Sequence, residues 1–461
     1  MEAYDFIVVG SGAAGGLLAH HLFEAGAKCL LLEAGKFYRA ETFPRTEAEY
    51  ASQLFWGGGL EFDNTVSMVF LRGKCVGGTT VVNQALLDRF DGVALSDWRT
   101  ASGVDFFTPE ALAPYYERVE RQLELQQFSE SHFNRNARLF VQGCDRLGYR
   151  WERLRRAQHD CALEEGNDCI GCLGGCHRDS KQSTLVAFIQ KAEKKGLEIV
   201  PECVVETVEP GRDRVRVHAV RNGRQKQTWA AQKVILAAAP FGTVKILFDS
   251  GFGKRLPALG KHFSTHPQFM SFGVFDEPVD AHKGAFQTVA SKDPRFRQQG
   301  FKLENVFAPP ISLAMLFEGL GRRHQEIMKR YRYLACIEVA IRDEAVGEIR
   351  VDRKGRLVVK KPLTDADRRR RDAGLQVVQA IFEAAGAREV VHARHYFGLH
   401  LMGGCAMGRD PETSVVNEAF QVHDVPNLYV ADASVFPNAP GINPSLTVMA
   451  LAEKLSEALG A

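Results

Sequence analysis

Two polar residues near the C-terminal end of the chain have side chains suited to proton transfer. His400 precedes a glycine pair in His400-Leu-Met-Gly-Gly-Cys405, and Asn443 precedes Pro444. An imidazole titrates near neutral pH, so it can accept a proton from a hydroxyl group. A neutral amide can orient the same oxygen without competing for its proton. Taken alone, His400 is equally typical of a structural histidine, and both interpretations stay open at this point.

A group of cysteines in the middle of the chain could bind a metal. Cys161, Cys169, Cys172 and Cys176 follow the spacing C-x7-C-x2-C-x3-C, with glycines between them that let the backbone fold around a small object. Thiolates at this spacing suit an iron–sulfur cluster, which is our first interpretation, or zinc. Disulfides, which an oxidising compartment would permit, and free thiols are the remaining alternatives.

Residues 5–35 have the pattern of a complete βαβ unit that binds a dinucleotide. The apolar run 6–9 leads into Gly10-Ser-Gly-Ala-Ala-Gly15, whose glycines allow a tight turn, close approach of a pyrophosphate and close packing of the next helix. The pyrophosphate would lie at the N-terminus of that helix. A second apolar run, 28–32, ends at Glu33, which can accept hydrogen bonds from a ribose. The unit predicts a bound dinucleotide but does not distinguish NAD from FAD.

Two further segments point toward the same ligand. Gly77-Gly-Thr-Thr80 offers backbone and threonine donors for a second phosphate-side contact, although an ordinary glycine turn is the alternative. Residues 427–431 predict a buried strand that ends at Asp432 and enters the first sheet from the far end of the chain. This arrangement favours FAD, with Asp432 as an acceptor for the ribityl hydroxyls. Pro444 then opens a final helix whose N-terminal dipole favours negative charge.

Composition and hydropathy exclude several classes of protein. The 461 residues carry a formal net charge of +2, which argues against binding to nucleic acid or to a membrane surface through bulk electrostatics. No apolar run approaches the length of a membrane span. The first strand begins close to Met1, so we expect no signal peptide and a cytoplasmic location. Export together with a partner that carries a signal stays open.

The region between the two motif-rich ends has a different pattern. Residues 268–395 contain strand-like stretches at 333–341 and 348–359, which indicate a mainly antiparallel sheet. The chain is therefore expected to be an α/β protein, with a Rossmann-like dinucleotide-binding domain and a second α+β domain that binds substrate. The expected parts are 1–265, with a cysteine-rich insertion near 161–176; 266–395 as the second domain; and 396–461 as the return to the first domain.

Together these motifs resemble the glucose–methanol–choline (GMC) family of FAD-dependent oxidoreductases. The resemblance rests on the fingerprint with Glu33, the loop 77–83, the segment 260–267 and the block 400–447, and the middle of the chain matches only in outline. It is strongest toward the cholesterol oxidase, long-chain alcohol oxidase and sugar dehydrogenase branches.

The resemblance implies oxidation of a small-molecule alcohol, with His400 as the proton acceptor and Asn443 bonded to the same oxygen, both facing flavin N5. It implies an electron acceptor other than NAD, such as an acceptor protein or small subunit, and some sugar dehydrogenases of this branch hold an iron–sulfur cluster in the region of Cys161–Cys176. A flavin-dependent lyase and an NAD-dependent dehydrogenase are the alternative functions. The residues expected to contact FAD are Gly10, Gly12, Ala13, Ala14, Gly15, Glu33, Ala34, Gly73, Gly77, Gly78, Thr79, Asn83, Val205, Asp432, Ala433, Asn443 and Pro444.

Overall fold

The predicted βαβ unit forms in a computed structural model that describes residues 3–461. β1 (Ala3–Val9) and β2 (Cys29–Leu32) pair in parallel, and α1 (Ala13–Glu24) connects them. β2 is buried along its whole length, as expected for a parallel strand covered on both faces. A Cβ atom on Gly15 would lie 1.9 Å from the carbonyl oxygen of Gly10, so only glycine allows α1 to pack this closely on the preceding turn.

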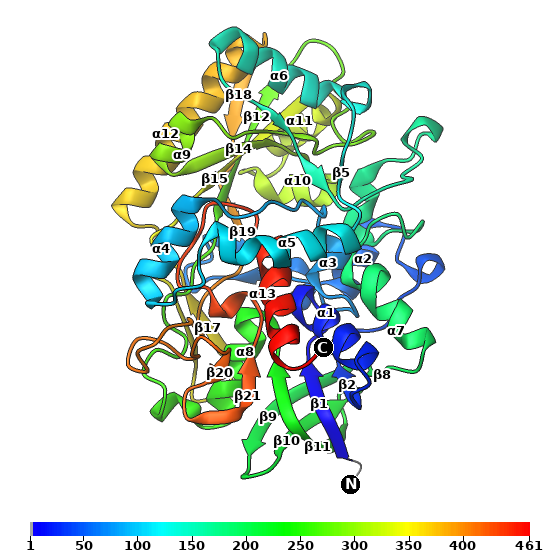
Figure 1. The fold of residues 1–461 in the computed structure, drawn as a ribbon. Helices are drawn as coiled ribbons and strands as arrows, with labels where there is room; N and C mark the ends of the chain where they lie inside the picture. The colour runs from blue at the N-terminus through cyan, green and yellow to red at the C-terminus, as the bar shows by residue number, and fades with distance from the viewer. Residues whose placement is uncertain (1–2) are drawn as a thin grey trace.

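The first sheet brings together strands from both ends of the chain. β21 (Val425–Val430) pairs in parallel with β11 (Gln225–Leu236), so the C-terminal strand enters this sheet as predicted. In the lower half of Figure 1, β11 lies between β21 and β1. The sheet order is β20 (Gln421–Val422), β21 (Val425–Val430), β11 (Gln225–Leu236), β1, β2 and β8 (Glu198–Val200), and the antiparallel strands β10 (Val215–Arg221) and β9 (Cys203–Pro210) extend from β11.

The last helix, α13 (Ser445–Ala458), packs against α1 and against α5 (Pro109–Gln122). Figure 1 shows α13 in red beside the blue α1. α5 ends at Gln122, close to Glu124, whose φ of 50° an α-helix does not accommodate.

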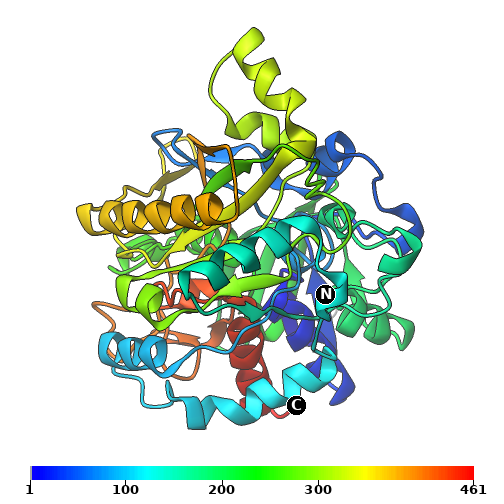
Figure 2. The same cartoon turned by 90° about the horizontal axis from the view of Figure 1, so that it is seen from above.

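The second sheet is mainly antiparallel, as predicted. Its central strands β12 (Pro267–Val274), β15 (Leu334–Ile341) and β14 (Phe301–Asn305) are fully buried. One face of the sheet is covered by α12 (Asp365–Ala384) and α6 (Arg135–Leu147). Both helices lie across this part of the molecule in Figure 2. The strand order is β3 (Glu61–Phe62), β4 (Met68–Phe70), β19 (Tyr396–Gly398), β12 (Pro267–Val274), β15 (Leu334–Ile341), β14 (Phe301–Asn305), β13 (Val289–Ser291) and β6 (Glu152–Arg153), with β18 (Glu389–His392) paired to β12.

Some segments differ from the sequence-based expectation in detail. The stretch 348–359, expected as one strand, is a hairpin of β16 (Glu348–Val351) and β17 (Leu357–Lys360), because the turn between them contains Gly355 with a φ of 74°. β3, β4, β6 and β19 join the second sheet from outside residues 266–395, and the domain boundaries stay a prediction.

The remaining elements surround the two sheets, and no described helix is long and apolar enough to cross a bilayer. They are α2 (Glu47–Leu54), α3 (Thr79–Val82), α4 (Gly92–Ser102), β5 (Gln126–Gln127), β7 (Arg155–Arg156), α7 (Gln190–Lys194), α8 (Ala239–Asp249), α9 (Pro294–Gln299), α10 (Pro310–Leu316) and α11 (Arg322–Lys329).

Candidate active site

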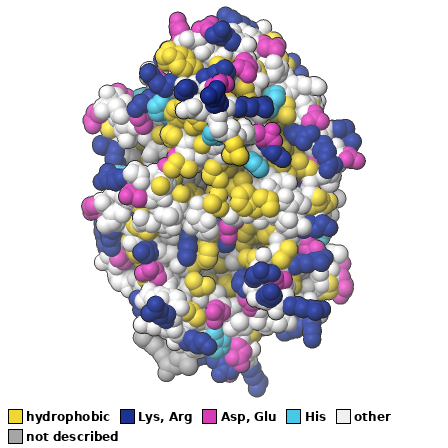
Figure 3. Space-filling view, turned by 180° about the vertical axis from the view of Figure 1, so that it is seen from behind, with side chains coloured by type: hydrophobic (Ala, Val, Ile, Leu, Met, Phe, Trp, Pro, Cys, Tyr) yellow, Lys and Arg dark blue, Asp and Glu magenta, His cyan; other side chains and the backbone are white. Residues whose placement is uncertain are grey.

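A cavity of about 980 Å³ is lined by residues of both sheets. The glycine fingerprint, the loop 73–83 and the start of α13 form one part of its wall, and residues of β12, β14 and β15 form another. On the side of the molecule opposite to Figure 1, apolar side chains gather around the middle of the surface (Figure 3). Most of the residues predicted to contact FAD line this cavity.

The N-terminus of α1 opens into the cavity. Gly10, Gly12, Ala13 and Ala14 line the wall, and Gly12, which caps the helix, supplies no side-chain acceptor. A Cβ atom on Gly12 would have no neighbour within 4 Å, so the space beside its backbone is free for a ligand. The unpaired N–H groups of the first turn therefore form a site for an anion such as a pyrophosphate.

Ser11 connects the two glycine motifs, and sequence reasoning did not single it out. Its hydroxyl donates to Glu33 Oε2 at 2.6 Å and accepts from the N–H of Gly77 at 2.9 Å. The backbone N–H groups of Ser11 and Gly35 also donate to the Glu33 carboxylate, whose pKa is raised by burial. Glu33 is thus held rigidly at the cavity wall, as its expected ribose contact requires.

The loop after β4 forms the opposite side of this part of the cavity. Gly73, Gly78, Thr79 and Asn83 line it, and the Thr79 hydroxyl accepts from the N–H of Gly73 at 3.0 Å. Ala34 and Val205 also reach the cavity, as expected. Two predicted contacts do not: Gly15, in the first turn of α1, faces the backbone of Gly10, and Gly77 lies behind the wall where its N–H is bonded to Ser11.

The C-terminal segment closes the cavity from the other end of the chain. Asp432 and Ala433 line it where β21 ends, and the Asp432 carboxylate accepts from Thr243 Oγ1 at 2.5 Å and from the N–H of Ser434 at 2.8 Å. Pro444 caps α13 without a side-chain hydrogen bond, so a second helix N-terminus faces the cavity.

A chain of hydrogen bonds orients His400 in the cavity wall. His400 Nδ1 lies 2.9 Å from Nδ1 of His266, and the N–H of Gly441 donates to His266 Nε2 at 2.8 Å. Burial and the nearby Lys302 ammonium lower the pKa of His400 to about 3, and burial and His400 lower the pKa of His266. Both imidazoles are therefore neutral at physiological pH.

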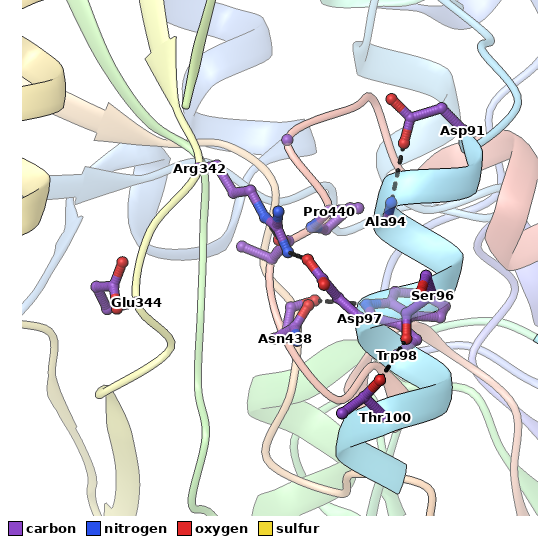
Figure 4. A network of polar contacts seen from close by, with 12 residues as sticks. Asp91, Ala94, Ser96, Asp97, Trp98, Thr100, Arg342, Glu344, Asn438 and Pro440 are labelled. Carbon is purple, nitrogen blue, oxygen red and sulfur yellow. Dashed lines mark hydrogen bonds and ion pairs between the residues drawn. The ribbon is translucent and has the colours of Figure 1, made fainter. Parts of the chain in front are cut away.

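The backbone that carries Gly441 is held from two sides (Figure 4). Arg342 donates to the carbonyl oxygen of Ala439 at 2.9 Å and pairs with Asp97 of α4. Trp98 Nε1, also on α4, donates to the carbonyl oxygen of Asn438 at 3.1 Å. These contacts fix the segment between the β21 end and Asn443.

Asn443 is oriented by a buried lysine on the second sheet. Lys302 Nζ lies 2.6 Å from Asn443 Oδ1 and also pairs with Glu304. Because an ammonium group only donates, the amide oxygen faces Lys302 and the Nδ2 donors are left for the cavity. Glu338, on the neighbouring strand β15, stands opposite Glu304 and belongs to the same buried network. Burial and Glu304 raise the pKa of Glu338 to about 8. No motif marked this network, whose members stand singly in buried strands.

The cysteine segment does not form the predicted iron–sulfur site. Among residues 3–461 no group of three or more potential ligands is arranged to hold a metal ion, and all ten cysteines are free thiols. Hydrogen bonds pair Cys161 with Cys169 and Cys172 with Cys176, lowering the pKa of Cys169 to about 7 and that of Cys176 to about 5.

A buried cation already stands at the cysteine segment. Lys181 Nζ donates to the carbonyl oxygens of Cys172 and Asn83, each at 2.7 Å, and its charge favours the Cys176 thiolate. Lys181 therefore connects the cysteine segment to the loop 73–83. The cysteines support that loop instead of converging on a metal.

These features fit FAD. Two helix N-termini without side-chain caps, one near each end of the chain, face one cavity. The carboxylates of Glu33 and Asp432 line the same cavity, where they could accept hydrogen bonds from the ribose and ribityl hydroxyls. The residues that would hold FAD are those of the fingerprint, the loop 73–83 and the segment 432–445.

Family models agree with this site. The model for the N-terminal part of GMC oxidoreductases matches residues 4–268, and the model for the C-terminal part matches residues 344–452. The chain is 28% identical to an uncharacterised GMC-type oxidoreductase of Sinorhizobium fredii, over 98% of this chain and 94% of that protein. It is 26% identical to the long-chain-alcohol oxidase FAO4A of Arabidopsis thaliana, over 97% of this chain and 67% of that protein. It is 23% identical to a cholesterol oxidase of Acinetobacter baumannii, over 98% of this chain and 93% of that protein.

Solved structures share the fold. Pyridoxine 4-oxidase from Mesorbium loti superposes with a TM-score of 0.73 at 17% identity, covering 99% of both chains. A formate oxidase variant of Aspergillus oryzae, studied for modification of its FAD, superposes with a TM-score of 0.72 at 15% identity, covering 99% of this chain and 98% of that chain. With the fingerprint, the C-terminal strand and both matched domains in place, the chain belongs to the GMC oxidoreductase family, whose members are flavoproteins that bind FAD.

Proposed function

We propose that the protein oxidises an alcohol to a carbonyl compound with FAD, and that His400 and Asn443 hold the alcohol oxygen. The observation that carries the proposal is that these two side chains, from separate segments, both line the cavity and are both influenced by Lys302, which bonds Asn443 and whose charge lowers the pKa of His400. FAD supplies the hydride acceptor when it is bound. The residues of this chain position the alcohol and manage its proton.

The hydrogen-bond chain sets a condition on the proposed proton transfer. Because Gly441 donates to Nε2 of neutral His266, the proton of His266 is on Nδ1 and is donated to His400 Nδ1. Neutral His400 then carries its own proton on Nε2 and first acts as a donor to the alcohol oxygen. To accept the alcohol proton on Nε2, His400 must carry its own proton on Nδ1, and His266 must then carry its proton on Nε2. The change on His266 removes the acceptor of the Gly441 N–H and costs about 1–3 kcal/mol.

Anaerobic spectroscopy tests the proposed function. The purified protein is expected to show the absorbance of oxidised flavin, and addition of its alcohol substrate under anaerobic conditions is expected to bleach that absorbance. Product formation with persistent flavin colour would indicate a lyase, and a colourless protein that reduces NAD would indicate an NAD-dependent dehydrogenase. Reoxidation by oxygen, compared with reoxidation by a quinone or a one-electron acceptor, then separates oxidase from dehydrogenase.

A further inference from the structure

One face of the second sheet places polar side chains at the cavity. In the strand register, Glu338 of β15 stands opposite both Met270 of β12 and Glu304 of β14. The neighbouring row places Gln268 of β12 and Lys302 of β14 on either side of Ala340. Side chains two residues apart on a strand share a face, so these residues form one surface. Gln268, Met270, Glu304 and Glu338 line the cavity.

This polar wall is continuous with the residues proposed to hold the reacting oxygen. Lys302 contacts both Glu304 and Asn443, Gln268 Nε2 donates to Glu338 Oε1 at 3.2 Å, and Gln287 Nε2 donates to Glu304 Oε2 at 2.9 Å. Glu304 is balanced by Lys302, and the raised pKa of Glu338 keeps it protonated near pH 7. The wall therefore offers hydrogen bonds but no unbalanced charge to an ionic ligand.

Two glutamines in the cavity wall each have an amide atom without a partner among the described residues. Gln268 is 3% exposed and its Oε1 has no hydrogen bond, and Gln84 is 8% exposed and its Nε2 has none. Gln84 Oε1 accepts from Arg156, which lies behind the wall and also donates to the carbonyl oxygen of Gln287. A buried polar atom without a partner costs about 1–3 kcal/mol, so a ligand that supplied both partners would be stabilised.

Apolar surface lies beside this wall. Phe286 and Phe307 line the cavity. A compound with carbon–hydrogen faces and several hydroxyl groups matches both kinds of surface. A sterol or a long aliphatic alcohol has one hydroxyl group, which the reaction centre uses, and would leave the glutamines unpaired.

We propose that the substrate is a neutral alcohol with several hydroxyl groups, of the polyol or sugar class, and that Gln268, Gln84 and the Glu304–Glu338 pair bind the hydroxyl groups that do not react. This inference rests on the proposed function and selects its substrate class. A site built to hydrogen-bond substrate hydroxyls discriminates strongly against analogues that lack them.

Matched pairs of alcohols test the substrate class with the wild-type holoenzyme. The first pair is myo-inositol and cyclohexanol, the second is D-glucitol and hexan-1-ol, and dodecan-1-ol and detergent-dispersed cholesterol represent lipophilic alcohols. The rate of anaerobic flavin bleaching at equal concentration is expected to be at least about 100-fold greater for a polyol than for its matched alcohol. Faster bleaching by the aliphatic alcohols or by cholesterol would overturn the inference while supporting the proposed function. Bleaching by no alcohol of either class would contradict both.

A glutamine variant tests the binding role of the wall. In Gln268→Leu, the ratio of kcat/KM for the better polyol to kcat/KM for its matched alcohol is expected to fall about 10-fold, since one hydrogen bond to a hydroxyl is lost. Gln84→Leu is expected to change the ratio in the same direction. Gln158→Leu is the matched control, because Gln158 is a fully buried glutamine with unpartnered amide atoms that does not line the cavity.

Flavin content and the melting temperature show whether each variant folds. An unchanged ratio in two folded variants, Gln268→Leu and Gln84→Leu, would reject the role of these side chains. An equal fall in the Gln158→Leu control would reject it as well, because the effect would then come from the core and not from the wall.

Discussion

The two walls of the cavity obtain their polar groups in different ways. On the side of the first sheet, backbone N–H groups of short contiguous motifs and two helix N-termini face the ligand, and the acidic side chains are tied to neighbouring backbone. On the side of the second sheet, charged and amide side chains come from three separate strands and bond mainly to one another. The first arrangement is specified locally, whereas the second exists only after the strands have paired.

We therefore expect FAD binding to depend mainly on the first wall and substrate binding mainly on the second. A wall made of backbone groups binds the same cofactor whatever the substrate, because its donors do not depend on side-chain identity. A wall made of side chains can change the substrate that it binds when a single residue in one of its strands is substituted. The following predictions test whether the two walls respond independently.

The largest expected effect is on the reaction itself. His400→Ala should lower kcat by about 10²- to 10⁴-fold, the usual contribution of a positioned acid–base group. The FAD content should stay that of the wild type, because no cofactor-side group is removed. His423→Ala, which changes a histidine bonded to Ser414 away from the cavity, is the control. A His400→Ala variant with near-normal kcat would show that His400 does not take part in the proposed proton transfer.

Removal of the buried lysine should affect stability next most strongly. Lys302→Met leaves the Glu304 carboxylate buried without its partner, and breaking such a pair typically costs about 3–5 kcal/mol of unfolding free energy. The double variant with Glu304→Gln should recover much of this loss. Urea unfolding measures both, and Lys195→Met, which breaks the exposed pair with Glu24, is the control that should lose much less stability. Equal losses in Lys302→Met and in the double variant would argue against the ion pair.

Glu338 should make the stability of the second wall depend on pH. Burial and Glu304 raise the pKa of its carboxyl group from 4.5 to about 8 in the folded protein, so the folded state binds the proton more tightly than the unfolded chain. Its contribution to stability is therefore full below pH 4.5 and is lost as the pH rises toward 8. Between pH 5 and pH 7, Glu338→Gln should gain up to about 3 kcal/mol relative to the wild type. Urea unfolding at the two pH values measures this gain, and Glu383→Gln, the same substitution at an exposed position, is the control.

The same contrast explains how much the sequence could predict. Glycines at 10, 12 and 15, with Glu33 after the second strand, predict the βαβ unit because their spacing is set by local geometry. Asp432 was predictable for a similar reason, since it ends a buried strand. Lys302, Glu304 and Glu338 stand alone in strands buried on both faces, so neither motif nor period-two alternation marks them.

The cysteine segment shows the opposite case, in which a local motif predicts a site that the fold does not form. Its spacing is local and favours a metal, but Lys181, which comes after the last of the four cysteines, places its ammonium group among them. The sequence does not indicate that this lysine turns inward, because its burial depends on the carbonyl oxygens of Cys172 and Asn83. His266 was within a segment that carried the family resemblance, but its bond to His400 required the fold.

The smallest expected effect concerns the link between the two glycine motifs. Ser11→Ala removes the hydroxyl that bonds Glu33 and Gly77, but Glu33 keeps the N–H donors of Ser11 and Gly35, so the loss of stability should be about 1–2 kcal/mol. FAD should dissociate about 10-fold more readily, because the loop that Ser11 joins to the fingerprint faces the cofactor, and kcat of the FAD-saturated enzyme should not change. Fluorescence of released flavin measures the dissociation. Ser180→Ala, which removes a buried hydroxyl bonded to Asp160, should leave FAD binding unaffected. If Ser11→Ala lowered kcat at saturating FAD, the two walls would be coupled, and the separation of cofactor binding from substrate chemistry would be wrong.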